Sequence, residues 1–185
     1  EDREGPLTAN QASGRSVDRK SGHHARTRIT AIASEDQVVV RRLLARRWKS
    51  TTIVRMGGTV HADRLDGFVA RSLTGVVTGL ITLRWTTGAC EVVTLDAIRK
   101  GRGIGSRLLA SAVSAVRRRR VGRIWLVTTN DNLEALRFYQ RRGFALKAIR
   151  RNALIVSRKL KPGIPVRGAY GIPLRDEIVL ERTLR

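Results

Sequence analysis

The chain has 185 residues, of which 37 are Lys or Arg and 15 are Asp or Glu, and its net charge at pH 7 is +22. This length predicts one domain, and a hydrophobic fraction of 42% excludes a wholly disordered chain. Cys90 is the single cysteine, which excludes an internal disulfide, and the longest apolar runs are too short to span a membrane. We therefore expect a cytoplasmic protein without a membrane partner.

Residues 1–26 are polar and lack periodicity, which predicts a disordered tail ahead of a domain over residues 27–185. His23 and His24 lie in this tail without further ligands at a spacing typical of metal sites, so we expect no metal. The positive charge makes nucleic acid a candidate partner. Because the arginines are spread along the whole chain, we do not favour that interpretation.

The first ordered elements are a short strand at 29–31 and a helix. Ser34 and Gln37 fit a capping box at the start of that helix, and Val40, Leu43, Leu44 and Trp48 share one helical face. Residues 52–95 consist of short β-branched runs separated by glycines, which predicts an antiparallel meander. Gly79 within one run indicates either a bulge or a small residue beneath a helix.

The second half alternates helices and strands. An apolar stripe predicts a long helix over residues 104–116, and a strand at 123–129 and a second helix from about residue 130 follow. This order predicts a parallel pair of strands joined by a right-handed crossover. We then expect a strand at 144–151, a short helix at 152–160 and a closing strand at 178–183.

The string KGRGIGSRLL places three glycines just before the long helix. A helix N-terminus with close backbone approach suits a phosphate or a pyrophosphate, although glycines serve tight turns equally well. The string G-x-x-x-x-G-K-[ST] does not occur, which excludes a Walker loop. The G-x-G-x-G spacing does not favour a dinucleotide fingerprint.

The string TNDNLEALRFYQRRGF contains the second helix. Asp131 with Glu134 fits a capping box and Gly143 fits a C-cap. Leu133, Leu136 and Phe138 are expected to anchor the helix to the sheet. Helix propensity leaves Asn132 and Tyr139 without an explanation.

Together these two strings resemble the GNAT superfamily of acyl-CoA-dependent N-acetyltransferases, in a small single-domain bacterial-type form. KGRGIG is similar to the family loop Gln/Arg-x-x-Gly-x-Gly/Ala, with Lys100 in the first place. NLEALRFYQRRGF is similar to Asn-x-x-Ala-x-x-Phe-Tyr-x-x-x-Gly-Phe. The resemblance implies an α/β (α+β) fold with a mixed, mostly antiparallel central sheet flanked by helices and one parallel crossover at the cofactor loop.

The resemblance also implies acetyl-CoA as the co-substrate. The expected cofactor-binding residues are a strand segment, the glycine loop and two residues of the second helix: Leu95, Ala97, Lys100, Gly101, Arg102, Gly103, Ile104, Gly105, Ser106, Asn132 and Tyr139. Lys100, Arg102 and Arg107 are expected to meet the phosphate charges.

Two residues are expected to be catalytic. By resemblance Tyr139 faces the sulfur and serves as the acid for the departing thiolate, and Glu91 is the general base through a water. A cationic amine also needs a local negative field, for which Asp96, Asp131, Asp176 and Glu177 are candidates.

We therefore expect the protein to transfer an acetyl group from acetyl-CoA to a primary amine of a small molecule, by direct attack in a ternary complex. We expect a monomer or a homodimer. One alternative is acetylation of a ribosomal protein or RNA through the basic surface. The other is a non-catalytic module that binds CoA or nucleic acid.

Overall fold

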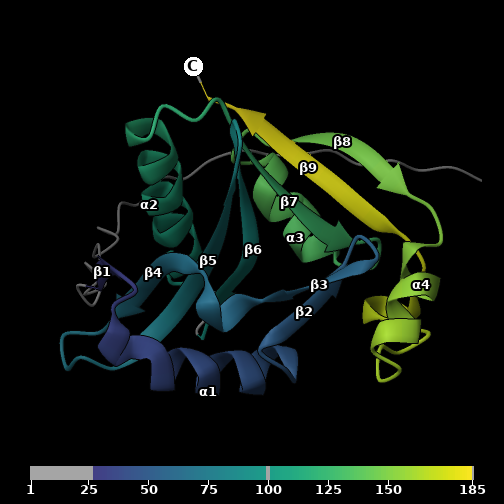
Figure 1. Ribbon diagram of the computed structural model, residues 1–185, viewed down its shortest axis with the longest axis horizontal. Helices are drawn as coiled ribbons and strands as arrows, with labels where there is room; N and C mark the ends of the chain where they lie inside the picture. The colour runs from purple at the N-terminus through teal and green to yellow at the C-terminus, as the bar shows by residue number, and fades with distance from the viewer. Residues whose placement is uncertain (1–26, 99–100, 185) are drawn as a thin grey trace, which may run out of the picture.

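The computed structural model describes residues 27–98 and 101–184 (Figure 1). The expected disordered tail therefore lies outside the described residues. The strands are β1 (Arg28–Ala31), β2 (Thr52–Arg55), β3 (Gly58–His61), β4 (Asp66–Arg71), β5 (Val77–Thr86), β6 (Ala89–Ala97), β7 (Arg123–Thr129), β8 (Ala145–Arg150) and β9 (Glu177–Thr183). The helices are α1 (Gln37–Trp48), α2 (Ile104–Arg118), α3 (Leu133–Gln140) and α4 (Ala153–Leu160).

Seven strands form the central sheet in the order β1-β4-β5-β6-β7-β9-β8. Neighbouring strands pair antiparallel except β6 and β7, which are parallel and joined through α2. A crossover helix is the usual way to join parallel neighbours. The predicted mixed sheet with one parallel crossover is confirmed.

The hairpin β2–β3 lies apart from the main sheet, so the expected single meander over residues 52–95 is wrong in its first part. Met56 and Gly57 turn the hairpin with φ angles of 51° and 75°, as a two-residue turn with two left-handed positions requires. Both Glu177 carboxylate oxygens accept the Met56 N–H at 2.9 Å. The hairpin tip is therefore fixed to β9, and Figure 1 shows the hairpin reaching from the α1 side toward β9 and α4.

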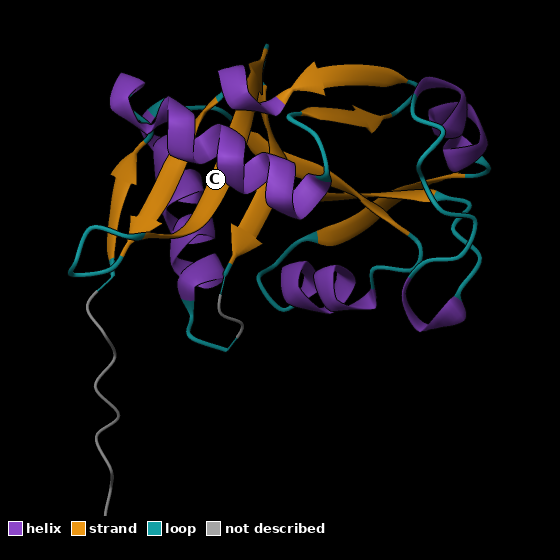
Figure 2. Cartoon of the chain, turned by 90° about the horizontal axis from the view of Figure 1, so that it is seen from below, coloured by secondary structure: helices purple, strands orange, loops and turns teal. Residues whose placement is uncertain are grey.

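Helices cover both faces of the sheet. Ile81 packs in the cluster with Leu108 of α2 and Tyr139 of α3. The neighbouring Leu80 packs in a second cluster with Leu44 of α1, because successive strand residues point to opposite faces. Figure 2 shows α1 lying across one face with α2 behind the sheet. Two apolar cores therefore hold the sheet between α1 with the hairpin on one side and α2 with α3 on the other.

The start of α1 differs from the expected capping box. A 3-10 turn over Ser34–Asp36 precedes the helix, which begins at Gln37. The Asp36 carboxylate accepts the Ala33 N–H at 3.0 Å and also pairs with Arg71. The Asp36 carboxylate therefore closes the 3-10 turn ahead of α1 and ties it to β4, and the expected N-cap at Ser34 is wrong.

Gly79 is a close-packed position under α2. A Cβ atom there would lie 2.8 Å from the Asp96 carbonyl oxygen, 2.8 Å from Ile104 and 3.0 Å from Leu108. The β4–β5 register also shifts beside it, between Ala70 and Arg71. Both alternatives considered for Gly79 therefore apply, and the absence of a side chain lets α2 sit directly on β5.

Candidate active site

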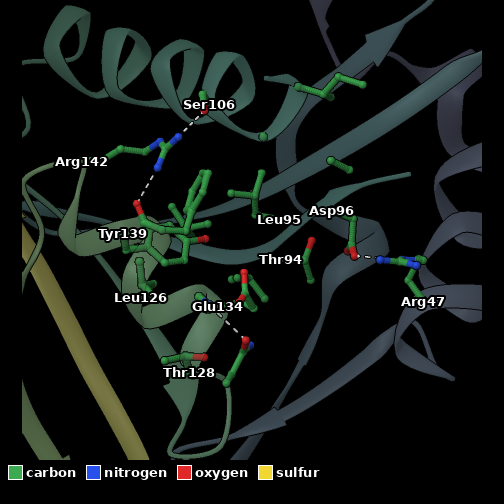
Figure 3. A pocket seen from close by; sticks show the side chains of 18 of the residues that line it. Arg47, Thr94, Leu95, Asp96, Ser106, Leu126, Thr128, Glu134, Tyr139 and Arg142 are labelled. Atoms are coloured by element: carbon green, nitrogen blue, oxygen red, sulfur yellow. Dashed lines mark hydrogen bonds and ion pairs between the residues drawn. The ribbon is translucent and has the colours of Figure 1, made fainter. Parts of the chain in front are cut away.

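A cavity of about 610 Å³ opens where β6 and β7 separate. The two strands pair from Ala89 with Arg123 to Val92 with Leu126, and in the described chain they do not pair beyond that point. Residues 93–97 of β6 and 127–128 of β7 line the cavity together with the glycine loop and α3 (Figure 3). This position, at the carboxyl ends of two parallel strands, is a usual place for a ligand.

The backbone of β6 offers free donors to this cavity. The β5–β6 register shifts between Thr82 and Leu83, which leaves Val93 as an extra residue in a bulge. Ile98 donates its N–H to Thr78 of β5 at 2.9 Å. Since the N–H groups of an antiparallel strand alternate in direction, those of Leu95 and Ala97 point away from β5, toward the opening. Leu95 and Ala97 are the two residues of this strand that we expected, from the sequence, to bind the cofactor.

The glycine loop closes one end of the cavity. Gly101 and Gly103 have φ angles of 77° and 71°, which favour glycine, and α2 begins directly afterwards at Ile104. The Arg107 N–H makes the first helical bond, to the Gly103 carbonyl at 3.1 Å. The N–H groups before it have no acceptor within the helix and are available to an anion. Gly101, Gly103, Ile104, Gly105 and Ser106 line the cavity.

Three cations expected at the loop have different placements. Lys100 lies outside the described residues, and Arg102 is exposed and does not line the cavity. Arg107 points to the start of β1, where it donates to the Thr27 carbonyl. Arg107 is therefore not part of the cavity lining in this structure, and its contact with the phosphates stays a prediction.

Arg142 is the guanidinium group that reaches the loop. It donates to the Ser106 hydroxyl and to the Phe138 carbonyl, the latter at 2.7 Å. Its guanidinium also lies 3.7 Å from the centre of the Phe138 ring, and that ring would lie 3.6 Å from a Cβ atom at Gly105. Arg142 is thus held rigidly beside the helix N-terminus.

Tyr139 projects from α3 into the cavity wall with 7% of its surface exposed. Its ring makes edge contacts with Phe138 and Phe144 at centroid distances of 5.0 and 5.3 Å. Burial, and then the charge of Asp96, raise the pKa of the phenol above its usual value. The phenol is therefore protonated throughout the neutral range.

The start of α3 corrects the expected capping box. Asn132 is the N-cap, and its side-chain oxygen accepts the Ala135 N–H at 3.2 Å. Asp131 instead accepts the Ala169 N–H at 2.8 Å and lies where a Cβ at Gly168 would stand. Asn132 lines the cavity, whereas Asp131 anchors a distant loop.

Asp96 is the carboxylate on the cavity wall among the four candidates for a local negative field. Arg47 and the Trp48 indole nitrogen, both at the end of α1, donate to its two oxygens. Asp176 is held by Arg175 and the Asn152 N–H. Glu177 accepts from Met56, and Asp131 accepts from Ala169. Asp131, Asp176 and Glu177 therefore connect structural elements and do not line the cavity.

Glu91 lies on β6 immediately before the cavity opens and has no exposed surface. Its Oε2 pairs with Arg55 of the hairpin and, at 2.9 Å, with Arg84 of β5. Its Oε1 has no hydrogen-bond partner among the described residues. Burial raises the pKa of this carboxyl, and the charges of Arg55 and Arg84 oppose that rise. Glu91 is not part of the cavity lining, so it reaches the cavity only through an intervening molecule.

Comparison with known proteins identifies this arrangement. Residues 29–144 match the model of the acetyltransferase (GNAT) family. The uncharacterized protein YxbD of Bacillus subtilis (strain 168) is 40% identical over 76% of this chain and 88% of its own length. The chain belongs to the GNAT acetyltransferase family.

Two solved structures share the GNAT fold. The IAA acetyltransferase from Bacillus cereus ATCC 14579 covers 86% of this chain and 100% of its own, with 22% identity and a TM-score of 0.61. A GNAT family acetyltransferase from Elizabethkingia anophelis with acetyl-CoA bound covers 85% of this chain and 98% of its own, with 18% identity and a TM-score of 0.61. This likeness confirms the fold that the family resemblance implied.

Three charged or indole side chains of this GNAT cavity, those of Arg142, Arg47 and Trp48, were not assigned to it from the sequence. Arg142 lies in the same string as Tyr139, three residues beyond it in the turn that follows α3, and that closeness in sequence was the available signal. Arg47 and Trp48 come from α1, and no local pattern linked them to Asp96. Within residues 27–98 and 101–184, no group of three or more His, Cys, Asp or Glu is placed to hold a metal ion, and no helix is long and apolar enough to cross a membrane.

Proposed function

We propose that this GNAT protein transfers an acetyl group from acetyl-CoA to a primary amine of a small molecule, by direct attack in a ternary complex. The observation that carries the proposal is the separation of β6 from β7 next to the N-terminus of α2. One opening thereby combines unpaired strand donors with an anion site. Its volume of about 610 Å³ is typical of sites for small molecules and cofactors.

The residues present fit acetyl-CoA. The loop N–H groups from Gly101 to Ser106 suit the pyrophosphate, and Leu95 and Ala97 offer N–H groups to the pantetheine arm. Lys100 stays a proposed contact of the phosphates, as does Arg102. The side-chain oxygen of Asn132 caps α3, so the side-chain NH2 group is the part left to bind the cofactor. A preorganised backbone donor at the thioester oxygen is worth roughly 3 kcal/mol in the transition state.

Tyr139 is proposed to stabilise the departing thiolate. A phenol of pKa about 10 facing a thiol of about 8.5 makes full proton transfer unfavourable by roughly 2 kcal/mol. Because burial raises the pKa of Tyr139 further, a hydrogen bond to the sulfur is favoured over complete transfer. The N–C bond forms as the C–S bond breaks, and the proton lost by the amine passes through the base to solvent.

Glu91 is proposed as the general base through a water molecule. Its Oε1 is unpaired among the described residues, and the side chain lies next to the bulge where the cavity begins. Burial raises the pKa of the carboxyl, which makes it a better proton acceptor than an exposed glutamate. Both oxygens of Asp96, by contrast, already accept hydrogen bonds. Asp96 is therefore assigned to the electrostatic attraction of a cationic amine.

Two segments near the α1 side of the sheet, the hairpin β2–β3 and the loop before β9, favour a small acceptor. The hairpin β2–β3 crosses from α1 toward β9 and is fixed there by Glu177 (Figure 1). Asn130 holds the loop before β9 through the Pro173 carbonyl at 2.9 Å and the Asp176 N–H at 2.9 Å. Neither segment lines the cavity itself. We propose that they limit the size of the acceptor from outside it, which suits a metabolite better than the surface of a ribosomal protein or an RNA.

The test is an acetylation screen over a panel of primary amines, with release of free thiol from acetyl-CoA as the readout. Products are then treated with hydroxylamine, which cleaves acetyl esters but leaves acetyl amides intact. We expect thiol release that depends on one amine class and yields a hydroxylamine-stable product. Thiol release without an amide product would contradict the proposed amine transfer.

A further inference from the structure

A second hollow, of about 470 Å³, adjoins the cavity along α3. Its lining residues are Glu134, Arg137, Phe138, Arg141 and Arg142. Glu134, Phe138 and Arg142 also line the main cavity, so the two spaces are continuous. The spacing of three and four residues places all five on one face of the helix and just beyond it.

Two of the three arginines are available to a ligand. Arg137 and Arg141 are exposed, and within the part of the chain that the structure describes neither guanidinium has a carboxylate partner. Glu134, in the same hollow, forms no ion pair with either of them. The hollow therefore presents unneutralised positive charge.

The third arginine joins the hollow to the glycine loop. Arg142 donates to Ser106 in the first turn of α2 and stacks on Phe138. Partial burial lowers the pKa of its guanidinium, and the neighbouring charge of Arg141 lowers it further. Two guanidinium groups are thus held close enough to repel each other, and an anion between them relieves that repulsion.

We propose that this arginine hollow binds the 3′-phosphate on the adenosine end of CoA. This inference rests on the proposed use of acetyl-CoA. With the pyrophosphate at the α2 N-terminus, the adenosine end must continue away from β6, and the Ser106–Arg142 hydrogen bond places α3 beside that path. A phosphate monoester carries close to two negative charges and matches the planar donor fork of arginine. The hollow thereby selects CoA over analogues that lack this phosphate.

The experiment compares CoA with 3′-dephospho-CoA by calorimetric titration at one fixed ionic strength, because exposed charge pairs are sensitive to salt. The proteins are the wild type, the double variant Arg137→Gln/Arg141→Gln, and the matched control Arg117→Gln/Arg120→Gln. The control removes the same charge from exposed positions at the end of α2. Arg142 is left intact because it also supports the loop.

We expect the wild type and the control to bind CoA about tenfold more tightly than dephospho-CoA. The Arg137/Arg141 variant should reduce this preference to about twofold or less while leaving the affinity for dephospho-CoA within about twofold. Equal affinities of the wild type for both ligands, or an equal loss for both in the variant, would overturn the phosphate assignment. Absence of binding to either ligand by the wild type would instead contradict the proposed function.

Discussion

Glu91 and Arg55 form a buried ion pair that joins β6 of the central sheet to β2 of the hairpin, and their side chains are 0% and 9% exposed. Arg84 supplies a second guanidinium to the same Glu91 oxygen. Removing one member of a buried pair leaves an uncompensated charge. Glu91→Gln should therefore lower the free energy of unfolding by about 3 kcal/mol in urea titration.

The matched control for that change is Glu181→Gln. Glu181 pairs with Arg123 and Lys147, whose side chains are 52% and 62% exposed. Solvent screens such pairs, so this variant should lose less than about 1 kcal/mol. Equal losses in the two variants would show that the Glu91 pair adds nothing to the attachment of the hairpin.

The same glutamate controls the expected pH dependence of the reaction. A general base must be deprotonated, so activity should rise with pH through the pKa of Glu91. Because burial raises that pKa, the acid limb of kcat against pH should lie above pH 4.5, the usual value. Glu91→Gln should lose about a hundredfold in kcat, and its residual activity should lack this limb. A folded variant that retains the acid limb would assign the base to another group.

Tyr139→Phe removes the phenol that faces the cavity while keeping the ring contacts with Phe138 and Phe144. We expect kcat to fall by about ten- to a thousandfold with little change in the KM for acetyl-CoA. Since the pKa of Tyr139 is raised, the wild-type rate should show no alkaline loss from phenol ionisation below about pH 10. Tyr170→Phe alters an exposed phenol and should leave kcat unchanged. Comparable kcat values for Tyr139→Phe and the wild type would reduce Tyr139 to a packing residue.

Gly79→Ala tests the close approach of α2 to β5. The new methyl group would meet the Asp96 carbonyl and Ile104 at 2.8 Å, which requires movement of the helix that carries the glycine loop. We expect a loss of about 1–3 kcal/mol in stability and weaker acetyl-CoA binding. In Gly122→Ala the added methyl meets no atom within 4 Å, so that variant should change stability by less than about 0.5 kcal/mol. A stable Gly79→Ala protein with normal binding would contradict the packing argument.

The sequence predicted the elements whose signals are local. The apolar stripe located α2, the β-branched runs located most strands, and the two motifs located the loop and α3. The parallel pairing of β6 with β7 followed from the rule that a crossover helix joins parallel strands. The separate hairpin could not be predicted, because its strands alternate like those of the sheet and its position depends on Glu177 far along the chain.

The missed details of the site have a common cause. Asp131 and Asn132 both favour N-caps, and the choice between them was decided by the Ala169 N–H, which engages Asp131 from a distant loop. From the sequence, Glu91 is indistinguishable from an ordinary strand residue, because its ion pair with Arg55 of the hairpin depends on the fold. Such long-range polar contacts leave no periodic signal in a single sequence.

The central claim is that the opening between β6 and β7 binds acetyl-CoA on the glycine loop. Calorimetric titration of acetyl-CoA tests it most directly, with Gly103→Val as the comparison because a β-branched residue is strained at a φ angle of 71°. We predict saturable binding at one site of the wild type, with a Kd between about 1 μM and 1 mM, and at least tenfold weaker binding by the variant. Absence of heat and of any thermal shift with the wild type at millimolar acetyl-CoA would contradict the account.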